Sequence, residues 1–243
     1  MRQTLLQKAG LLSLMLIATG AFLSGCIEEP NPPVLDRVTS EVRFVHAVPN
    51  TGPNPVSVDI WVDGNKEFSN ANFKDASGYL TINSGNRFLR VVPAGGDTSA
   101  AIFRQLVSVR SLTKMTMAFF GSDADVQLLI TQERFTYADE TSKLVDSCDV
   151  KLINLSNTGT DYKLQRKVDP DYVDLIPIVA KGSLSSYKRL ASENADFAVS
   201  TDGNARAVEF NQTLGKPGYR YSFIVVGNTG GLEVLRLQDE PKN

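Results

Sequence analysis

The sequence predicts an all-β protein built of two tandem antiparallel β-sandwich domains. Apolar residues recur at every second position in short segments, which is the pattern of half-buried strands, and Gly, Asn, Asp or Pro residues separate these segments. Long segments with the 3.6-residue period of an amphipathic helix do not occur. Related segments also return later in the chain, and 243 residues with 42% hydrophobic residues suffice for two domains.

The segment 56–62 shows the alternation most clearly. Val58, Ile60 and Val62 share one face of a strand, so we predict that these side chains are buried and that Asp59 is exposed. Asp63-Gly64 then closes a tight turn, because both residue types tolerate a positive φ. Eight strands are predicted in the first domain, at residues 42–48, 56–62, 66–68, 79–82, 88–92, 101–109, 115–120 and 126–131.

Segments that match in the same order indicate two copies of one domain. Copies of about 100 residues are too long for solenoid repeats and suit independent immunoglobulin-like sandwiches. The matching segments are 42–48 with 150–156 and Ser77-Gly78-Tyr79 with Ser185-Ser186-Tyr187, both 108 residues apart, and 126–129 with 232–235, which are 106 residues apart.

The first 25 residues have the anatomy of a secretory signal. Arg2 and Lys8 precede an apolar segment at 9–23, which is shorter than the roughly 20 residues of a membrane-spanning helix. The residues Leu23-Ser24-Gly25-Cys26 resemble the bacterial lipobox, and this resemblance implies that Cys26 becomes the lipidated amino terminus of the mature protein. The alternative is an ordinary secretory signal in which Cys26 is incidental.

Residues 26–40 form a predicted tether, because three Pro residues favour an extended spacer. In lipoproteins of enteric-type bacteria, an Asp directly after the lipidated Cys resembles an inner-membrane retention signal. This chain has Ile27 at that position and so lacks the signal. We therefore expect a lipid-anchored protein of the outer membrane and leave open which side of that membrane it faces. The predicted organisation is signal peptide 1–25, tether 26–40, domain 1 at 41–137, linker 138–147 and domain 2 at 148–240.

Charge and residue types exclude several classes of function. The chain has 25 basic and 27 acidic residues, so it lacks the basic excess that favours a nucleic-acid partner. His46 is the only histidine, which excludes a histidine cluster for zinc and a Ser-His-Asp triad elsewhere in the chain. We predict no enzyme activity, no cofactor and no metal site. If Cys26 carries lipid, Cys148 has no disulfide partner, and we expect a buried thiol.

Domain 1 also carries the motifs of a bacterial family. Residues 42–49 read V-R-F-V-H-A-V-P, residues 58–64 read V-D-I-W-V-D-G, and Tyr79 and a P-A-G at 93–95 follow. These motifs resemble the domain of unknown function 4397 family, which occurs in secreted and lipid-anchored bacterial proteins. Trp61 stands where that family usually has Tyr. The resemblance implies a β-sandwich and a cell-envelope location, and it implies no particular activity.

Candidate binding residues lie in four loops of domain 1. If each strand reverses the one before it, the loops at 49–55, 69–78, 93–99 and 122–125 meet at the end of the sandwich away from the tether. Loops on a rigid scaffold often carry binding residues, so the candidate contacts are Asn54, Asn72, Asp97 and Asp123. The alternative is that these residues only form turns.

The predicted function is a lipid-anchored cell-envelope protein with a non-catalytic binding or structural role for a protein or glycan partner. Trp61 beside Asp59 and Asp63 is a further candidate contact for a carbohydrate. The alternative is an enzyme that acts on envelope polysaccharide through Asp59, Asp63 or the carboxylates of loop 122–125. The two carboxylates of loop 122–125 suggest a calcium site as a further alternative, but the formation of a turn explains the same residues.

Overall fold

The computed structural model describes residues 38–49, 57–133, 146–215 and 217–239, all within one compact unit, Val38–Asn243. The predicted signal peptide, Cys26, the tether up to residue 37, Asn54 and most of the predicted linker lie outside the described residues. The described residues form strands and one 3₁₀ turn, and none of their helices is long and apolar enough to cross a membrane.

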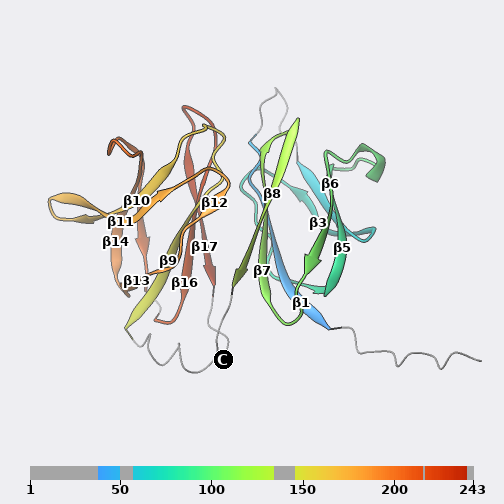
Figure 1. Ribbon diagram of the computed structural model, residues 1–243, viewed down its shortest axis with the longest axis horizontal. Coiled ribbons are helices and arrows are strands. Elements are labelled where there is room, and N and C mark those ends of the chain that lie inside the picture. The colour runs from blue at the N-terminus through green and yellow to red at the C-terminus, as the bar shows by residue number, and fades with distance from the viewer. Residues whose placement is uncertain (1–37, 50–56, 134–145, 216, 240–243) are drawn as a thin grey trace, which may run out of the picture. The chain divides into compact units, whose positions relative to one another are not determined.

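The first sandwich consists of two four-stranded sheets (Figure 1). Sheet A has the strand order β4-β1-β7-β8 and sheet B has the order β3-β2-β5-β6. All eight strands predicted from the sequence are confirmed, with bounds that differ by a few residues. They are β1 Thr39–His46, β2 Val58–Val62, β3 Asn65–Ala71, β4 Leu80–Asn83, β5 Gly85–Pro93, β6 Phe103–Val109, β7 Lys114–Ser122 and β8 Asp125–Glu133, with η1 Thr98–Ala100 between β5 and β6.

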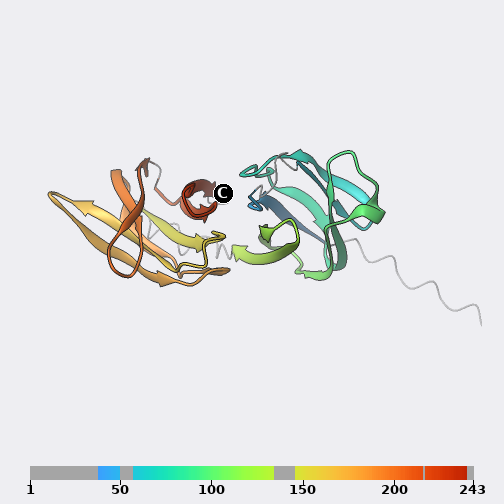
Figure 2. The same ribbon diagram turned by 90° about the horizontal axis from the view of Figure 1, so that it is seen from above.

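The second sandwich repeats this strand order (Figure 2). Sheet C has the order β12-β9-β16-β17, with β13 also paired to β9, and sheet D has the order β11-β10-β14-β15. The strands are β9 Ser147–Asn154, β10 Tyr162–Val168, β11 Asp171–Val179, β12 Ser183–Leu184, β13 Lys188–Ala191, β14 Asn194–Ser200, β15 Arg206–Thr213, β16 Arg220–Val226 and β17 Glu233–Asp239.

The expectation of wholly antiparallel sheets needs a correction in each sandwich. Strand β1 pairs with β7 in parallel, and β9 pairs with β16 in the same way. Because successive strands of the first sandwich reverse direction, its first and seventh strands, β1 and β7, point the same way, and they are neighbours in the sheet. In the second sandwich β12 and β13 both run antiparallel to β9, so the eighth strand, β16, takes the place of β7. The parallel pair therefore follows from the alternation itself.

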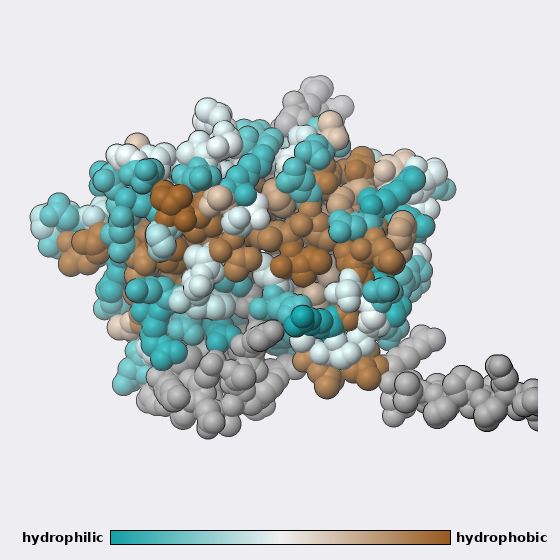
Figure 3. All heavy atoms as spheres, in the orientation of Figure 1, coloured by the Kyte–Doolittle hydropathy of each residue, from teal (hydrophilic) through white to brown (hydrophobic). Residues whose placement is uncertain are grey.

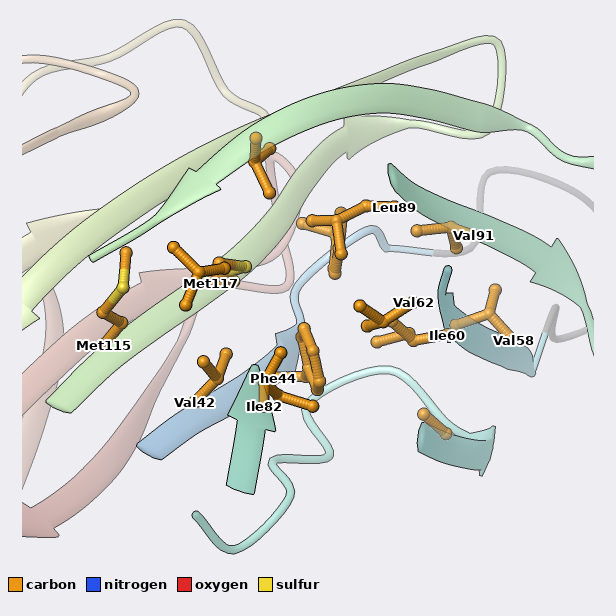
Figure 4. Close-up of a cluster of buried hydrophobic side chains, with 14 of the residues drawn as sticks. Val42, Phe44, Val58, Ile60, Val62, Ile82, Leu89, Val91, Met115 and Met117 are labelled. Carbon is orange, nitrogen blue, oxygen red and sulfur yellow. The ribbon is translucent and has the colours of Figure 1, made fainter. Parts of the chain in front are cut away.

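Each sandwich has its own apolar core between its two sheets. Figure 4 shows the first core, where Val58, Ile60 and Val62 of β2 meet Phe44 of β1 and Met117 of β7. The predicted burial of the β2 stripe is confirmed, since the three residues are at most 3% exposed. Burial of these apolar side chains stabilises the first sandwich.

The predicted burial of Cys148 is also confirmed. This residue lies in β9, within the core of the second sandwich, and its side chain is not exposed. Burial, helped by the neighbouring Asp149 carboxylate, raises the pKa of the Cys148 thiol to about 11. The thiol is therefore neutral and shielded, which excludes it as a nucleophile in the folded protein.

Equivalent backbone contacts recur at the spacing of 108 residues that the sequence indicates. In the first sandwich the backbone N–H of Phe44 donates to Ser77 Oγ at 2.9 Å, and in the second the N–H of Leu152 donates to Ser185 Oγ at 3.0 Å. The tyrosines that follow are each contacted by two cations. Tyr79 has Arg43 and Lys114 over its ring at 4.6 and 4.8 Å, and Tyr187 has Lys151 and Arg220 at 4.8 and 4.9 Å.

A third apolar core joins the outer face of sheet A to the outer face of sheet C. The two sandwiches thus bury a face of one sheet each against the other, as stacked sheets do. The buried residues of this core are Val45, Ala47, Ala118 and Phe120 from sheet A or its loops, and Ile153, Leu155, Ile224, Val226 and Leu237 from sheet C or its loops.

A buried ion pair lies beside this third core. Arg43 Nη2 in β1 is 3.0 Å from Asp239 Oδ1 in β17, and the Tyr79 hydroxyl donates to the same carboxylate at 2.8 Å. Arg43 is 6% exposed and Asp239 is 1% exposed. An ion pair with this burial holds its partners in one geometry, because either charge left alone away from water is costly.

Candidate functional site

The described parts of the loops chosen from the sequence lie at one end of the first sandwich. The backbone N–H of Ala94 donates to Ser57 O at 2.8 Å, and Ser57 Oγ donates to Asn72 Oδ1 at 2.8 Å. These bonds join Ser57, directly before β2, to the loops that follow β3 and β5, and the β7–β8 turn falls at the same end because β7 runs parallel to β1. Asn54 lies outside the described residues.

The described candidates in these loops each make a local hydrogen bond of the kind that forms turns. The backbone N–H of Asn72 donates to Asp75 Oδ2 at 2.8 Å. Asp97 Oδ1 accepts the N–H of Ser99 at 2.7 Å and so caps η1, and this bond lowers the pKa of the Asp97 carboxyl. Asp123 Oδ1 accepts the N–H of Ala124 at 3.1 Å. Turn formation therefore accounts for these polar residues, and ligand contact by them stays a prediction.

The carboxylates of loop 122–125 are also engaged within their own turn. The Asp125 N–H donates to Ser122 Oγ at 3.2 Å, and Gln127 Nε2 donates to Asp125 Oδ2 at 3.0 Å. Among the residues that the structure describes, no three His, Cys, Asp or Glu side chains gather as a metal site requires. His46 is buried at the end of β1.

The prediction that Asp59 is exposed is wrong, since only 2% of this residue is accessible. Strand β3 has an irregular register opposite β2, and Asn70 there adopts a positive φ of 52°. This irregularity aims the Asn70 N–H at Asp59 Oδ1, at 2.8 Å, while Lys66 Nζ and the Gly95 N–H reach Oδ2 at 2.6 and 3.2 Å. Asp59 thus ties β2 to β3 and to the turn after β5.

Asp63 and Trp61 have separate partners on the same sheet. Asp63 Oδ2 lies 2.6 Å from Arg87 Nη1, and its Oδ1 accepts the Phe88 N–H at 2.8 Å. Lys66 Nζ lies 5.2 Å from the centre of the half-buried Trp61 ring. Each carboxylate is therefore neutralised by its own cation, and the arrangement does not form the facing acid pair of a glycosidase.

A polar hollow of about 560 Å³ lies on the outer face of sheet D, at a place that the sequence did not indicate. Leu164 of β10 and Phe197 of β14 point into the core of the second sandwich. Because side chains alternate along a strand, Lys163 and Gln165, on either side of Leu164, face outward. The polar side chains that line the hollow are Lys163 and Gln165 from β10, Asp171, Tyr172 and Asp174 from β11, Asn204 from the turn before β15, and Arg206 from β15.

A hydrogen-bond network fixes the floor of this hollow. Lys163 Nζ is 2.8 Å from Asp174 Oδ2, and Gln165 Nε2 donates to Asp174 Oδ1 at 2.8 Å and to Asn204 Oδ1 at 3.2 Å. Ser200 Oγ donates to Gln165 Oε1 at 2.6 Å. The side chain of Lys163 is 7% exposed and that of Asp174 is 55% exposed. The Lys163 ammonium and the Gln165 amide lower the pKa of the Asp174 carboxyl, so it is ionised at neutral pH.

An aromatic ring forms the wall of the hollow nearest the β10–β11 turn. Arg206 Cζ lies 4.9 Å from the centre of the Tyr172 ring, and the Tyr172 hydroxyl donates to Glu209 Oε2 at 3.3 Å. Arg206 Nε is also 2.7 Å from Glu209 Oε1. The ring is therefore held at both its face and its hydroxyl. The hollow combines fixed hydrogen-bond donors, a half-exposed acceptor and an aromatic surface, and these are the groups with which proteins bind polar molecules.

The hollow on sheet D could not be predicted from the sequence pattern, for a physical reason. Lys163 and Gln165 alternate with apolar residues, and such alternation is typical of a solvated sheet face. Asp171 belongs to the segment Asp169-Pro170-Asp171, whose composition is typical of a turn. The network depends on a register that places Asp174 opposite Gln165, and on a turn that brings Asn204 to the same point.

A second, apolar hollow of about 320 Å³ lies between β11 and β12. Its lining includes Ile178 and Leu184, which are 38% and 41% exposed. Figure 3 shows apolar side chains gathered on the face of the molecule that carries β8 and β12. Apolar side chains form the larger part of this lining, so it suits contact by an apolar surface better than recognition of a polar ligand.

The fold and the hollow define a two-sandwich β-protein with a polar hollow on one outer sheet. A family model described as Domain of unknown function (DUF4397) matches residues 40–161, and the chain belongs to that family. The matched segment covers the first sandwich and extends into the second as far as the loop after β9. No curated protein sequence matches the chain.

Solved structures with a limited likeness to the chain include a carbohydrate-binding module and a fimbrial protein. A family 26 carbohydrate-binding module from Eubacterium rectale Amy13K, in complex with maltoheptaose, has 12% identity and a TM-score of 0.28, with 84% of this chain and 100% of that chain covered. The tip fimbrial protein Mfa3 from Porphyromonas gingivalis has 10% identity and a TM-score of 0.28, with 84% and 99% covered.

A third likeness is to family 41 carbohydrate-binding modules from streptococcal virulence factors, in a structure that concerns α-glucan recognition. It has 10% identity and a TM-score of 0.24, with 78% of this chain and 93% of that chain covered. At these TM-scores the likenesses carry no argument about the function of this chain, which is therefore derived from its own residues.

The buried Asp59 predicts a pH dependence of stability. Burial raises the pKa of its carboxyl, but Lys66 and the N–H groups of Asn70 and Gly95 outweigh this effect and lower the pKa below its ordinary value. A lowered pKa stabilises the fold above the unfolded-state value of about 3.9, and this stability is lost as the pH falls through the folded-state value. The difference in free energy of unfolding between wild type and Asp59→Asn is therefore larger at neutral pH than in acid.

Urea unfolding of both proteins, at about pH 7 and about pH 3, measures this difference. Asp123→Asn, at an exposed turn, is the matched control and should leave the free energy of unfolding nearly unchanged at both pH values. An Asp59→Asn difference that stays the same at both pH values would contradict the role assigned to the carboxylate.

Proposed function

We propose that this protein is a non-catalytic binding protein of the bacterial cell envelope, anchored through lipid on Cys26, which holds a glycan or protein partner in the polar hollow of sheet D. The observation that carries the proposal is the network around Asp174, where buried donors from β10 meet a half-exposed carboxylate. Groups that are already fixed in place lose little entropy when a ligand binds, so the network favours binding.

The engagement of the other acidic residues supports a non-catalytic role. Asp59 is enclosed by three donors, and Asp63 is bound by Arg87 and by a backbone N–H. A general acid needs a raised pKa, yet the pKa values of both carboxyls are lowered, because the hydrogen bonds outweigh the effect of burial. Both side chains serve the fold of the first sandwich.

Anchoring through Cys26 predicts the behaviour of a single substitution. Cys26→Ser removes the thiol that would take the lipid, so the protein should leave the membrane fraction and appear in the soluble fraction after cell fractionation. Cys148→Ala is the matched control, since Cys148 is the other cysteine of the chain and should leave the protein membrane-bound. A Cys26→Ser protein that stays in the membrane fraction with its signal removed would show that the anchor is not this lipid.

Binding through the hollow predicts that substitutions in its wall weaken capture of envelope material. The full chain carrying Cys26→Ser serves as the common background, so that no lipid contributes to capture. Tyr172→Ala removes the aromatic wall and Asp174→Asn removes the charge of the half-exposed acceptor. Each should raise the Kd for the isolated cell-envelope fraction about tenfold, which corresponds to about 1.4 kcal/mol.

Asp196→Asn is the matched control, because Asp196 is an exposed carboxylate on β14 of the same sheet and does not line the hollow. It should bind as the background protein does, and far-UV circular dichroism should show that all three variants are folded. Equal capture by Tyr172→Ala, Asp174→Asn and the background protein would exclude the hollow as the binding site.

A further inference from the structure

The chemistry of the hollow narrows the class of its occupant. We infer that the hollow on sheet D binds a neutral glycan segment through adjacent hydroxyl groups, an inference that rests on the proposed function and specifies its ligand. Four observations carry it: the spacing of donors and acceptors, the charge of the lining, the place of the hollow on the sheet, and the fixed aromatic ring.

Donors and acceptors lie side by side in the hollow, as adjacent hydroxyl groups require. An ionised carboxylate has about four acceptor positions, and Asp174 accepts from Lys163 and Gln165 while its side chain remains 55% exposed. The ammonium of Lys163 has three N–H donors, of which one points at Asp174. A sugar hydroxyl both donates and accepts, so a pair of neighbouring hydroxyls can bond to the carboxylate and to a nitrogen donor together.

The charges that line the hollow are balanced. Lys163 and Arg206 contribute two positive charges, and Asp171 and Asp174 contribute two negative charges. A phosphate or carboxylate ligand would meet the Asp174 carboxylate, and a cationic ligand would meet Lys163 or Arg206. A neutral ligand meets neither repulsion, and it is not required to lose the strong hydration of an ion when it enters the hollow.

The place of the hollow disfavours an extended peptide. Strand β10 is an inner strand of sheet D, hydrogen-bonded to β11 on one side and to β14 on the other. Peptides that add to a sheet bond to the free backbone of an edge strand, and the hollow lies on the face of the sheet instead. Recognition there depends on side chains alone, as it does for a ring bearing hydroxyl groups.

The Tyr172 ring supplies the apolar contact that a sugar ring also needs. The C–H groups of a pyranose form an apolar face, and aromatic rings pack against such faces while their polar edges remain hydrogen-bonded. Tyr172 is fixed by Arg206 and Glu209, so little rotamer entropy is lost on contact. A volume of about 560 Å³ lies within the range of small-ligand sites, and it therefore suits a short segment of a glycan.

The test uses the full chain with Cys26→Ser and the isolated cell-envelope fraction as the probe. Periodate cleaves neighbouring hydroxyl pairs, so periodate treatment of the envelope should reduce capture at least tenfold, whereas protease treatment should leave capture nearly unchanged. Capture should also be equal at low and high salt, because a neutral ligand has no charge to be screened. A glycan array of neutral and acidic oligosaccharides then identifies a binder, and Asp174→Asn should weaken its Kd about tenfold while Asp196→Asn does not.

The outcomes separate this inference from the proposed function. Capture that protease abolishes and periodate spares would overturn the glycan inference and leave a protein partner, so the proposed function would stand. Capture that high salt abolishes, or array binding confined to acidic glycans, would overturn the neutral class. An untreated envelope fraction that does not bind the protein at all would overturn both the inference and the proposed function.

Discussion

The apolar contact between sheets A and C determines which surfaces of this protein remain for a ligand. A sheet in a sandwich has one face in the core of its own domain, and its other face is free for water or for a partner. In sheets A and C that second face is apolar and forms the third core, with Phe120 and Ile224 among its buried residues. The outer faces of sheets B and D are left to solvent, and the polar hollow lies on sheet D.

The two sandwiches use equivalent positions on these outer sheets differently. Asp59 in β2 is in register with Val92, and Gln165 in β10 is in register with Ala198, both 106 residues later. In sheet B the irregular strand β3 encloses Asp59 with Lys66 and backbone donors. In sheet D the carboxylate belongs to β11, and Asp174 keeps a half-exposed side chain. One topology thus gives a sealed structural contact in one sandwich and an open polar site in the other.

Local sequence patterns predicted the strands and the apolar stripe of β2 because both depend on neighbours in the chain. Alternation places Val58, Ile60 and Val62 on one face wherever the strand lies, and their burial follows. It also placed Asp59 on the outer face correctly, but it gave no information on the irregular neighbour β3, whose Lys66 side chain and Asn70 N–H bond to the carboxylate. Burial of a polar residue on an outer face depends on the register of the adjacent strand, which alternation within β2 does not reveal, so Asp59 was mistaken for an exposed residue.

Contacts between distant segments were beyond sequence analysis for the same reason. Asp239 lies 196 positions from Arg43, and nothing near either residue indicates the pair. The hollow likewise needs the register of β10 with β11 and the turn that carries Asn204. The loop residues Asn72, Asp97 and Asp123 show the reverse case. Their residue types suggested a binding site in the sequence, whereas in the structure they take part in local hydrogen bonds that form turns.

We expect the third core and the Arg43–Asp239 pair to make the two sandwiches unfold as one cooperative unit. Chemical unfolding of Asp239→Ala tests it most directly, with Lys74→Ala as the control, because Lys74 and Glu233 form an exposed ion pair also between the sandwiches. Wild type should unfold in one transition, with losses of about 3–5 kcal/mol for Asp239→Ala and about 0–1 kcal/mol for Lys74→Ala. Two separate transitions in wild type, with Asp239→Ala no less stable than Lys74→Ala, would contradict the account.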